Sequence, residues 1–198
     1  MKGRNRCKST WRTISLSKRS LVGVYWGRFN PPHKGHLSVI RKLKDKCNLV
    51  VAIGSSEHKN EKTNPFSGSE RKEMMVSYLK ESKIKGVRVV TLDDGESESW
   101  AVDNLIKKVK PDILFLSTEK SELTGLAKGR VHVVSFERTG VVSSTLIRDS
   151  ITSGDDRWIN LTGKSVAKLI IEFDGINRIR KAYGVDRKES GCHALAGP

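Results

Sequence analysis

The sequence predicts an α/β protein, a Rossmann-like doubly wound parallel sheet with a small C-terminal helical subdomain. Short apolar runs alternate with longer amphipathic stretches, and the pattern becomes helical after Arg148. The apolar runs are continuous in Val, Ile and Leu, which is typical of strands covered by helices on both faces. The alternation predicts right-handed β-α-β crossovers, with ligands bound beyond the carboxyl ends of the strands.

Five apolar runs are the expected strands of the sheet. In chain order they are Leu21–Trp26, Leu49–Gly54, Val87–Leu92, Ile113–Ser117 and Val131–Phe136. The amphipathic stretches between them are the expected crossover helices, namely Lys34–Lys46, Ser67–Ser82, Glu98–Val109 and Glu119–Lys128. Proline disfavours helical backbone in the residue before it, so Lys110-Pro111 should end the third helix.

From about residue 145 the sequence predicts helices alone. The first spans Thr145–Thr152, with Ser144 or Thr145 as its N-cap, because a hydroxyl there accepts a bond from a free backbone N–H. Further helical stretches are Trp158–Leu161, Val166–Phe173 and Ile176–Tyr183. We expect them to pack on the sheet as a small cap.

The two ends of the chain differ from its centre in composition. Residues 1–20 hold seven basic residues and no acidic ones, which predicts a basic, disordered leader. Residues 186–198 have the composition of a disordered tail. The domain itself is therefore expected to span residues 21–185, long enough to bury a proper core.

The formal net charge of +15 raises the alternative of a basic nucleic-acid-binding protein. Seven of these charges belong to the leader, and the rest of the chain has no helix-turn-helix, zinc or sheet-aromatic module. This distribution argues against a nucleic-acid partner. Salt-sensitive binding that persists without residues 1–20 would reopen that alternative.

Cysteine usage and hydropathy indicate a cytoplasmic protein without a membrane partner. No apolar run approaches the roughly 18 residues of a membrane span. The three cysteines, Cys7, Cys47 and Cys192, are odd in number and lack metal-ligand spacing. Free thiols in a reducing compartment are the interpretation we prefer.

Residues 27–36, directly after the first strand, read Gly-Arg-Phe-Asn-Pro-Pro-His-Lys-Gly-His. His33 and His36 open a helical pattern, so their imidazoles and the free helix N–H groups meet at one sheet edge, where phosphate would sit. Gly35 permits close approach, and Arg28 is placed to hold two phosphates. By themselves the histidines could equally cap a helix or bind a structural metal, and Asn30 could contact phosphate or merely close the turn.

A second segment, Ser143-Ser-Thr-Leu-Ile-Arg148, has the same construction. Hydroxyls precede a helix, and Arg148 follows one turn later on the same face. By itself this is an ordinary capped helix with a surface arginine. Paired with the first segment, it predicts a nucleotidyl transferase.

These two segments resemble the nucleotidylyltransferase superfamily in its adenylyltransferase branch. Three further segments are similar to the archaeal-type nicotinamide-nucleotide adenylyltransferases. They are Ile53-Gly-Ser-Ser56, Asn64-Pro-Phe-Ser-Gly-Ser-Glu-Arg71 and Asp174-Gly-Ile-Asn-Arg-Ile-Arg-Lys181, so the resemblance covers nearly all of residues 21–183. It implies transfer of AMP from ATP to nicotinamide mononucleotide, giving NAD and pyrophosphate.

The resemblance also implies roles for individual residues. The catalytic residues would be His33, His36, Arg28 and Arg148. ATP and its phosphates would contact Gly27, Phe29, Asn30, Gly35, Ser144 and Thr145. The mononucleotide would contact Trp100, Asp93, Asn64, Pro65, Phe66 and Arg71, with Asp94 competing for the role of Asp93. Mg²⁺ would accompany ATP without protein ligands, and the chain would be a homo-oligomer.

Several alternatives remain open from the sequence. The same phosphate-binding residues would serve an adenylyl- or cytidylyltransferase acting on FMN, pantetheine phosphate or glycerol phosphate. Nicotinamide and nicotinate mononucleotide are not distinguished. The chain has Ser117-Thr118-Glu119 where the family has Ser-Gly-Asn, which leaves the details of adenine recognition open.

Overall fold

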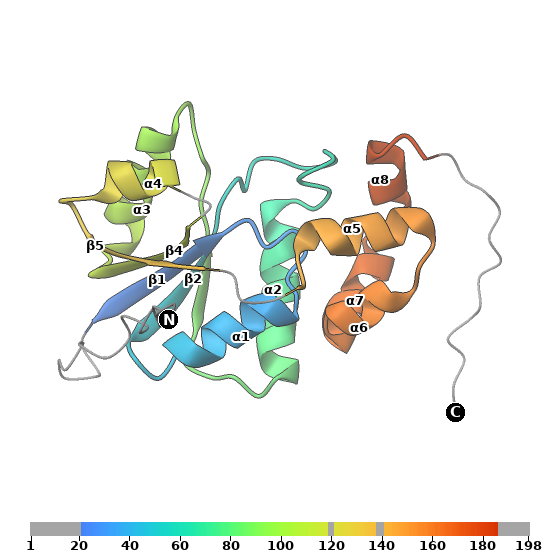
Figure 1. The fold of residues 1–198 in the computed structure, drawn as a ribbon, viewed down its shortest axis with the longest axis horizontal. Coiled ribbons are helices and arrows are strands. Elements are labelled where there is room, and N and C mark those ends of the chain that lie inside the picture. The colour runs from blue at the N-terminus through green and yellow to red at the C-terminus, as the bar shows by residue number, and fades with distance from the viewer. Residues whose placement is uncertain (1–20, 119–120, 138–140, 186–198) are drawn as a thin grey trace, which may run out of the picture.

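The computed structural model describes residues 21–118, 121–137 and 141–185. Five parallel strands form one sheet in the order β3-β2-β1-β4-β5 (Figure 1). Their bounds are β1 Val22–Gly27, β2 Asn48–Ile53, β3 Arg88–Thr91, β4 Ile113–Ser117 and β5 His132–Phe136. The predicted doubly wound parallel sheet is confirmed, with each strand within one or two residues of its expected bounds.

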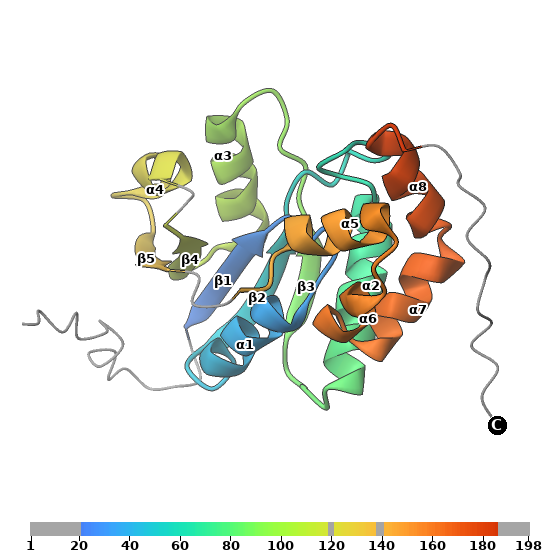
Figure 2. The same cartoon turned by 45° about the vertical axis from the view of Figure 1, so that its right-hand side comes forward.

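Helices cover both faces of the sheet (Figure 2). On one face lie α1 Lys34–Leu43 and α2 Gly68–Glu81, and on the other lie α3 Glu98–Val109 and α4 Ser121–Ala127. Beside α1 and α2, the described residues after β5 form four more helices, namely α5 Ser144–Ser153, α6 Arg157–Leu161, α7 Lys164–Glu172 and α8 Gly175–Ala182. None of the helices described is both long enough and apolar enough to cross a bilayer.

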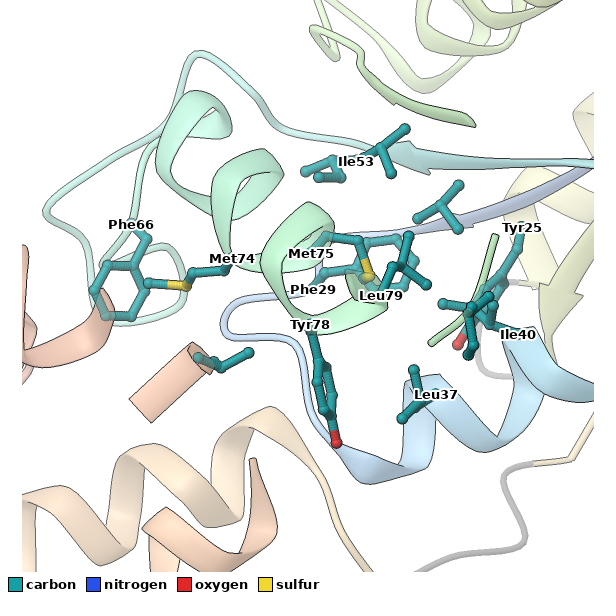
Figure 3. Packing of buried hydrophobic residues seen from close by; sticks show 14 of the residues in the cluster. Tyr25, Phe29, Leu37, Ile40, Ile53, Phe66, Met74, Met75, Tyr78 and Leu79 are labelled. Atoms are coloured by element: carbon teal, nitrogen blue, oxygen red, sulfur yellow. The ribbon is translucent and has the colours of Figure 1, made fainter. Parts of the chain in front are cut away.

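Alternate strand residues enter two separate cores, one on each face of the sheet. In β2, Val51 and Ile53 pack toward α1 and α2, whereas Val50 and Ala52 pack toward α3 and α4. The α1–α2 core also contains apolar residues of α5–α8, and Figure 3 shows its packing around α2. Because both faces are apolar, the strands appear as the continuous apolar runs seen in the sequence.

Two local predictions about the helices were wrong. The N-cap of α5 is Ser143, not Ser144 or Thr145, since the Ser143 hydroxyl accepts from the Leu146 N–H at 3.0 Å. Helix α1 ends at Leu43, before the expected Lys46, because the chain turns away after its last buried residue. The predicted leader, the predicted tail and Glu119 at the start of the fourth predicted helix lie outside the described residues.

Helix α8 is fastened to the rest of the domain at two points. Gly175 lies against the Phe66 ring so closely that a Cβ there would be 2.6 Å from ring atoms. Arg178 donates to Glu70 of α2 at 2.6 Å and to the Pro65 carbonyl at 2.5 Å. Burial raises the pKa of Glu70, but the bonds from Arg178 and Ser67 outweigh it and leave that pKa lowered. The C-terminal helix is therefore held against the loop that precedes α2.

Candidate functional site

A pocket of about 190 Å³ lies at the carboxyl ends of β1 and β4. Strand β1 is the point at which the strand order reverses, because the chain builds β2 and β3 on one side and β4 and β5 on the other. In open α/β sheets this switch point is where ligands bind. The pocket is lined by Tyr25, Trp26, Gly27, Arg28, Phe29, Asn30, His36, Thr63, Ser117, Ser143, Ser144, Thr145 and Arg148.

One side of the pocket is the N-terminus of α1, where two histidines cap the helix. The Nδ1 atom of His33 accepts from the Gly35 N–H at 3.1 Å, and Nδ1 of His36 accepts from the His33 N–H at 3.3 Å. A ring nitrogen that accepts a hydrogen bond carries no proton, so the proton of each neutral imidazole is on Nε2. The cap thus makes Nε2–H of each histidine a hydrogen-bond donor.

The two imidazole rings are themselves held by packing. They stack on each other with centroids 3.7 Å apart, and the edge of Phe29 meets His36 at 4.7 Å. Phe29 has φ +51° and is 1% exposed, with its ring folded over Gly27, where a Cβ would be 3.0 Å from the ring. Phe29 therefore supports the histidines from the core while it also lines the pocket.

Close packing also explains why position 35 is a glycine. A Cβ at this position would lie 2.9 Å from the His33 ring and 3.3 Å from the Val142 carbonyl oxygen. Gly35 and His33 are not among the residues that line the pocket. His36 is thus the member of the histidine pair that lines the pocket, and His33 and Gly35 build the N-terminus of α1 directly beside it.

The other side of the pocket is the N-terminus of α5. The hydroxyl of Ser144 donates to the Pro31 carbonyl at 3.0 Å, which joins this helix to the turn before α1. The first amides of an α-helix have no acceptor within it, and the first turns of α1 and α5 contain no acidic residue. Two positive helix ends therefore face one small pocket, an arrangement suited to an anion.

Two arginines add full positive charge to this pocket. Arg28 is exposed, and Arg148 is 6% exposed. Arg148 donates from Nη1 to the Asn30 carbonyl at 2.8 Å, from Nη2 to the Thr145 hydroxyl at 3.2 Å and from Nε to the Tyr183 hydroxyl at 3.2 Å. Its guanidinium is thus oriented by the protein while it lines the pocket.

Asn30 lines the pocket, but its side chain is used within the protein. The amide donates to the Phe66 carbonyl at 3.2 Å and accepts from the Phe66 N–H at 3.3 Å, a two-way pairing with one backbone unit. It also donates to Asn64 at 3.4 Å. The interpretation of Asn30 as a loop-closing residue therefore describes its side chain better than a phosphate contact.

None of the six residues expected at the mononucleotide lines this pocket, and four of the six are buried. Arg71 is fully buried, and its guanidinium donates to four carbonyl oxygens of Arg28, Gly54, Ser55 and Ser67 at 2.6–3.1 Å. Burial lowers the pKa of Arg71 to about 10. Asn64, Pro65 and Phe66 are also buried, in the joint with Asn30 and α8. These four residues therefore support the loops beside the pocket.

Trp100 differs from these four because it is exposed. It lies in the first turn of α3, where 44% of its surface is exposed. Its ring lies over Gly95, which has φ +61° and where a Cβ would be 2.2 Å from the indole. An aromatic face supported from beneath and open above suits the stacking of a planar ring.

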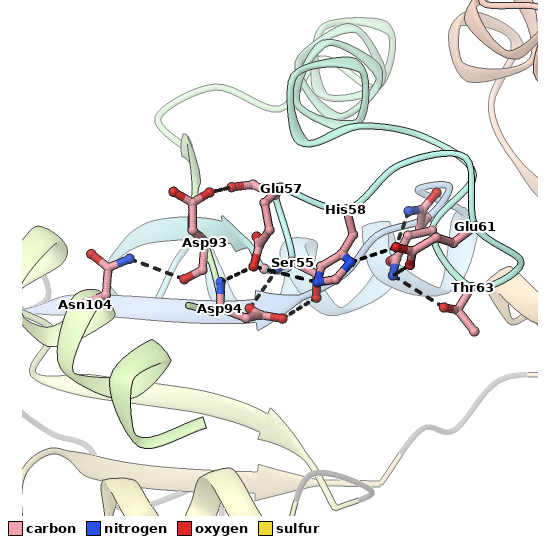
Figure 4. A network of polar contacts seen from close by, with 12 residues as sticks. Ser55, Glu57, His58, Glu61, Thr63, Asp93, Asp94 and Asn104 are labelled. Carbon is pink, nitrogen blue, oxygen red and sulfur yellow. Dashed lines mark hydrogen bonds and ion pairs between the residues drawn. The ribbon is translucent and has the colours of Figure 1, made fainter. Parts of the chain in front are cut away.

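A polar network along the same sheet edge positions the loop before Trp100 (Figure 4). Asp94 accepts from the Ser55 N–H at 2.8 Å and donates its own N–H to Glu57 at 2.9 Å, while Asp93 bonds the Ser56 hydroxyl. Both carboxylates thus join the loop after β2 to the loop after β3.

The loop after β2 continues through a second set of contacts. His58 pairs with Glu61 at 2.8 Å, a bond that raises the pKa of the imidazole, and Glu61 also accepts from Asn64 at 3.2 Å. This loop brings Thr63 to the pocket.

Five pocket residues were absent from the predicted site residues, namely Tyr25, Trp26, Thr63, Ser117 and Ser143. Tyr25 and Trp26 directly precede Gly27 at the end of β1, and Ser117 ends β4, so their signal was their place near strand ends beside the switch point. Thr63 had no comparable signal, because it reaches the pocket through a loop.

Comparison with known proteins agrees with this geometry. Residues 24–150 match the protein family described as Cytidylyltransferase-like. The chain is 32% identical over 168 residues to the nicotinamide-nucleotide adenylyltransferase of Methanococcus maripaludis, covering 82% of this chain and 96% of that protein. It is 31% identical over 178 residues to the enzyme of the same name from Saccharolobus solfataricus, covering 83% and 98%.

Solved structures share the fold. A bifunctional NMN adenylyltransferase/ADP ribose pyrophosphatase from Francisella tularensis superposes with a TM-score of 0.61 at 22% identity, covering 82% of this chain and about half (52%) of that one. A nicotinic acid mononucleotide adenylyltransferase from Plasmodium falciparum gives 0.54 at 13% identity, covering 81% and 98%. By sequence, and in keeping with its fold, the chain belongs to the nicotinamide-nucleotide adenylyltransferases of the cytidylyltransferase-like family.

Proposed function

We propose that this protein transfers the AMP group of ATP to nicotinamide mononucleotide, forming NAD and pyrophosphate. The observation that carries the proposal is the convergence of two helix N-termini, Arg28 and Arg148 on one pocket at the switch point of the sheet. Such a pocket suits a polyphosphate. Nicotinamide mononucleotide is proposed as the acceptor because the archaeal relatives are named nicotinamide-nucleotide adenylyltransferases.

The proposed reaction needs no nucleophile from the protein. An oxygen of the mononucleotide phosphate attacks the α-phosphorus of ATP, and the bond from that phosphorus to the pyrophosphate oxygen breaks. Arg28, Arg148 and the first amides of α5 hold the triphosphate. The Nε2–H groups of His36 and His33 donate to phosphate oxygens as negative charge develops, and His33 also keeps the start of α1 in place. Catalysis is then positioning plus electrostatics.

We propose Mg²⁺ as the metal, bound to the ATP phosphates. Among the residues that the structure describes, no group of three or more His, Cys, Asp or Glu is placed to hold an ion. Mg²⁺ commonly binds through substrate phosphates and water, so the ion would enter the pocket bound to ATP. When bound, it would neutralise charge on the phosphates. The Francisella structure is named as a complex with AMP and a manganese ion.

Two further expectations concern location and assembly, the first from cysteine usage and hydropathy and the second from the family resemblance. We propose that the protein acts in the cytoplasm and assembles as a homo-oligomer. Light scattering coupled to size-exclusion chromatography measures the assembly directly, and a monomer at micromolar concentration would contradict it.

The test of the function is an assay with several acceptors in parallel. ATP and Mg²⁺ are supplied with nicotinamide mononucleotide, nicotinate mononucleotide, FMN, pantetheine phosphate or glycerol phosphate, and both dinucleotide and pyrophosphate are measured. We expect pyrophosphate and NAD in equal amounts with the nicotinamide substrate. Pyrophosphate formed only with FMN, pantetheine phosphate or glycerol phosphate would still support nucleotidyl transfer. It would show that nicotinamide mononucleotide is not the acceptor.

Trp100 is the residue that we propose stacks on the nicotinamide ring. Trp100→Ala should raise KM for nicotinamide mononucleotide about tenfold or more, since stacking of a base on an aromatic side chain contributes about 1–3 kcal/mol. KM for ATP should stay unchanged. Trp100→Phe is the control, because it keeps an aromatic face over Gly95. Equal KM values for the mononucleotide in Trp100→Ala and wild type would remove Trp100 from the site.

A further inference from the structure

We propose that Tyr183, at the end of α8, is a positioning residue that sets the orientation of Arg148 in the pocket. The proposal rests on the proposed function, in which Arg148 holds the triphosphate. Tyr183 does not line the pocket, so it would act through Arg148 and not by touching substrate. The two residues are 35 positions apart in the chain and belong to different helices.

The hydrogen bonds of Arg148 show what Tyr183 contributes. The three nitrogens of the guanidinium each donate to one protein oxygen, and the Tyr183 hydroxyl takes the Nε–H at 3.2 Å. Each Nη carries a second N–H, so two donors remain beyond these three bonds. Three acceptors in different directions fix the plane of the guanidinium. Removal of the Tyr183 hydroxyl would leave the guanidinium plane free to rotate about the two remaining hydrogen bonds.

Tyr183 can serve as a fixed point because its helix is anchored. It is the C-cap of α8, and its N–H bonds the carbonyl oxygens of Ile179 and Arg180. Its ring packs against the α1–α2 core. The same helix begins at Gly175 against Phe66 and is held by the ion pair between Arg178 and Glu70. The phenol oxygen is therefore set by the packing of α8, independently of any ligand.

A second contact reaches the same ring from the loop after β2. The Lys62 ammonium lies 4.7 Å from the centroid of Tyr183, a cation–π contact. Lys62 directly precedes Thr63, which lines the pocket. Tyr183 thus joins α8, Arg148 of α5 and the loop of Thr63, so three separate parts of the chain meet at one phenol.

The decisive variant is Tyr183→Phe, which removes the hydroxyl and keeps the ring for Lys62 and the core. We expect its affinity for ATP, measured by titration calorimetry, to fall about tenfold, as for loss of a hydrogen bond to a charged group. We expect kcat/KM for ATP to fall by a similar factor, with KM for nicotinamide mononucleotide unchanged. Tm should fall by only a few degrees, because one hydrogen bond is lost while ring packing is kept.

Two controls separate positioning from general destabilisation. Tyr78→Phe removes another hydroxyl, which donates to the Thr162 carbonyl at 3.4 Å in the core, and should leave ATP affinity unchanged. Arg148→Lys removes the Nε–H, so adding Tyr183→Phe to it should cause no further loss of affinity. A full additional loss in the double variant, or wild-type affinity in Tyr183→Phe, would overturn the proposal.

The calorimetric measurement does not depend on the acceptor. A wild-type protein that binds ATP but forms no NAD would contradict the proposed function, while the affinities of the variants would still decide the role of Tyr183. If the double variant binds ATP too weakly for calorimetry, competition against a fluorescent ATP analogue gives the same comparison.

Discussion

Replacing His36 by asparagine is expected to lower kcat by about 10²–10³-fold, the usual loss for one preorganised donor at developing charge. The asparagine oxygen occupies the place of Nδ1, so it can still accept the His33 N–H that His36 accepts at 3.3 Å. Stability should therefore change little. What the variant lacks is a donor at the position of Nε2.

His36→Gln is the matched control, because its amide nitrogen reaches the position of Nε2 while the acceptor at Nδ1 is lost. This variant should keep part of the activity and lose about 1 kcal/mol of stability, as for removal of a helix cap. Steady-state NAD formation and urea unfolding measure both quantities. Equal kcat in His36→Asn and wild type would remove the Nε2–H from the mechanism.

Replacing Arg71 by methionine is expected to give the largest loss of stability, about 3 kcal/mol in the free energy of unfolding. Methionine fills similar space but donates no hydrogen bond, so the carbonyl oxygens of Arg28 and Gly54 lose their side-chain donor, while those of Ser55 and Ser67 keep a backbone N–H. Each unsatisfied group costs about 1–3 kcal/mol. Part of that loss is offset, because the variant no longer buries a charge. The low pKa of Arg71, about 10, reflects that cost of burial.

The variant Arg71→Lys separates the contribution of the positive charge to stability from that of the guanidinium shape. A lysine keeps the positive charge, but its single nitrogen cannot span carbonyls that follow two different strands. We expect a loss of about 1–2 kcal/mol, between wild type and Arg71→Met, in equilibrium unfolding by urea. A free energy of unfolding for Arg71→Met within about 0.5 kcal/mol of wild type would show that the four bonds contribute nothing net.

The fold was predictable because its signals are local. Continuous apolar runs such as residues 49–53 mark strands buried on both faces, and Lys110-Pro111 marks the end of α3 at Val109. The two phosphate-binding segments were also recognisable, since a helix N-terminus is encoded by a few adjacent residues. Strand order then brings Arg28 and Arg148 to one pocket, although they are far apart in the chain.

The partners of individual side chains were not predictable. Arg71 carries the same charge as Arg148, and the sequence does not say whether a guanidinium meets phosphate or backbone carbonyls. That depends on burial, which long-range packing decides. The pairing of Asn30 with Phe66 and the bond between Arg148 and Tyr183 likewise join distant parts of the chain. Such contacts have no periodicity that a sequence pattern would reveal.

The close contact of Trp100 with Gly95 has a consequence for how this protein can vary in evolution. Any side chain at position 95 would have to displace the indole, and the positive φ there also disfavours it. The two positions are therefore not independent: a glycine at 95 is needed wherever a large aromatic stands at 100. Among relatives, loss of the aromatic should free position 95 to change, so covariation of the pair would record the contact.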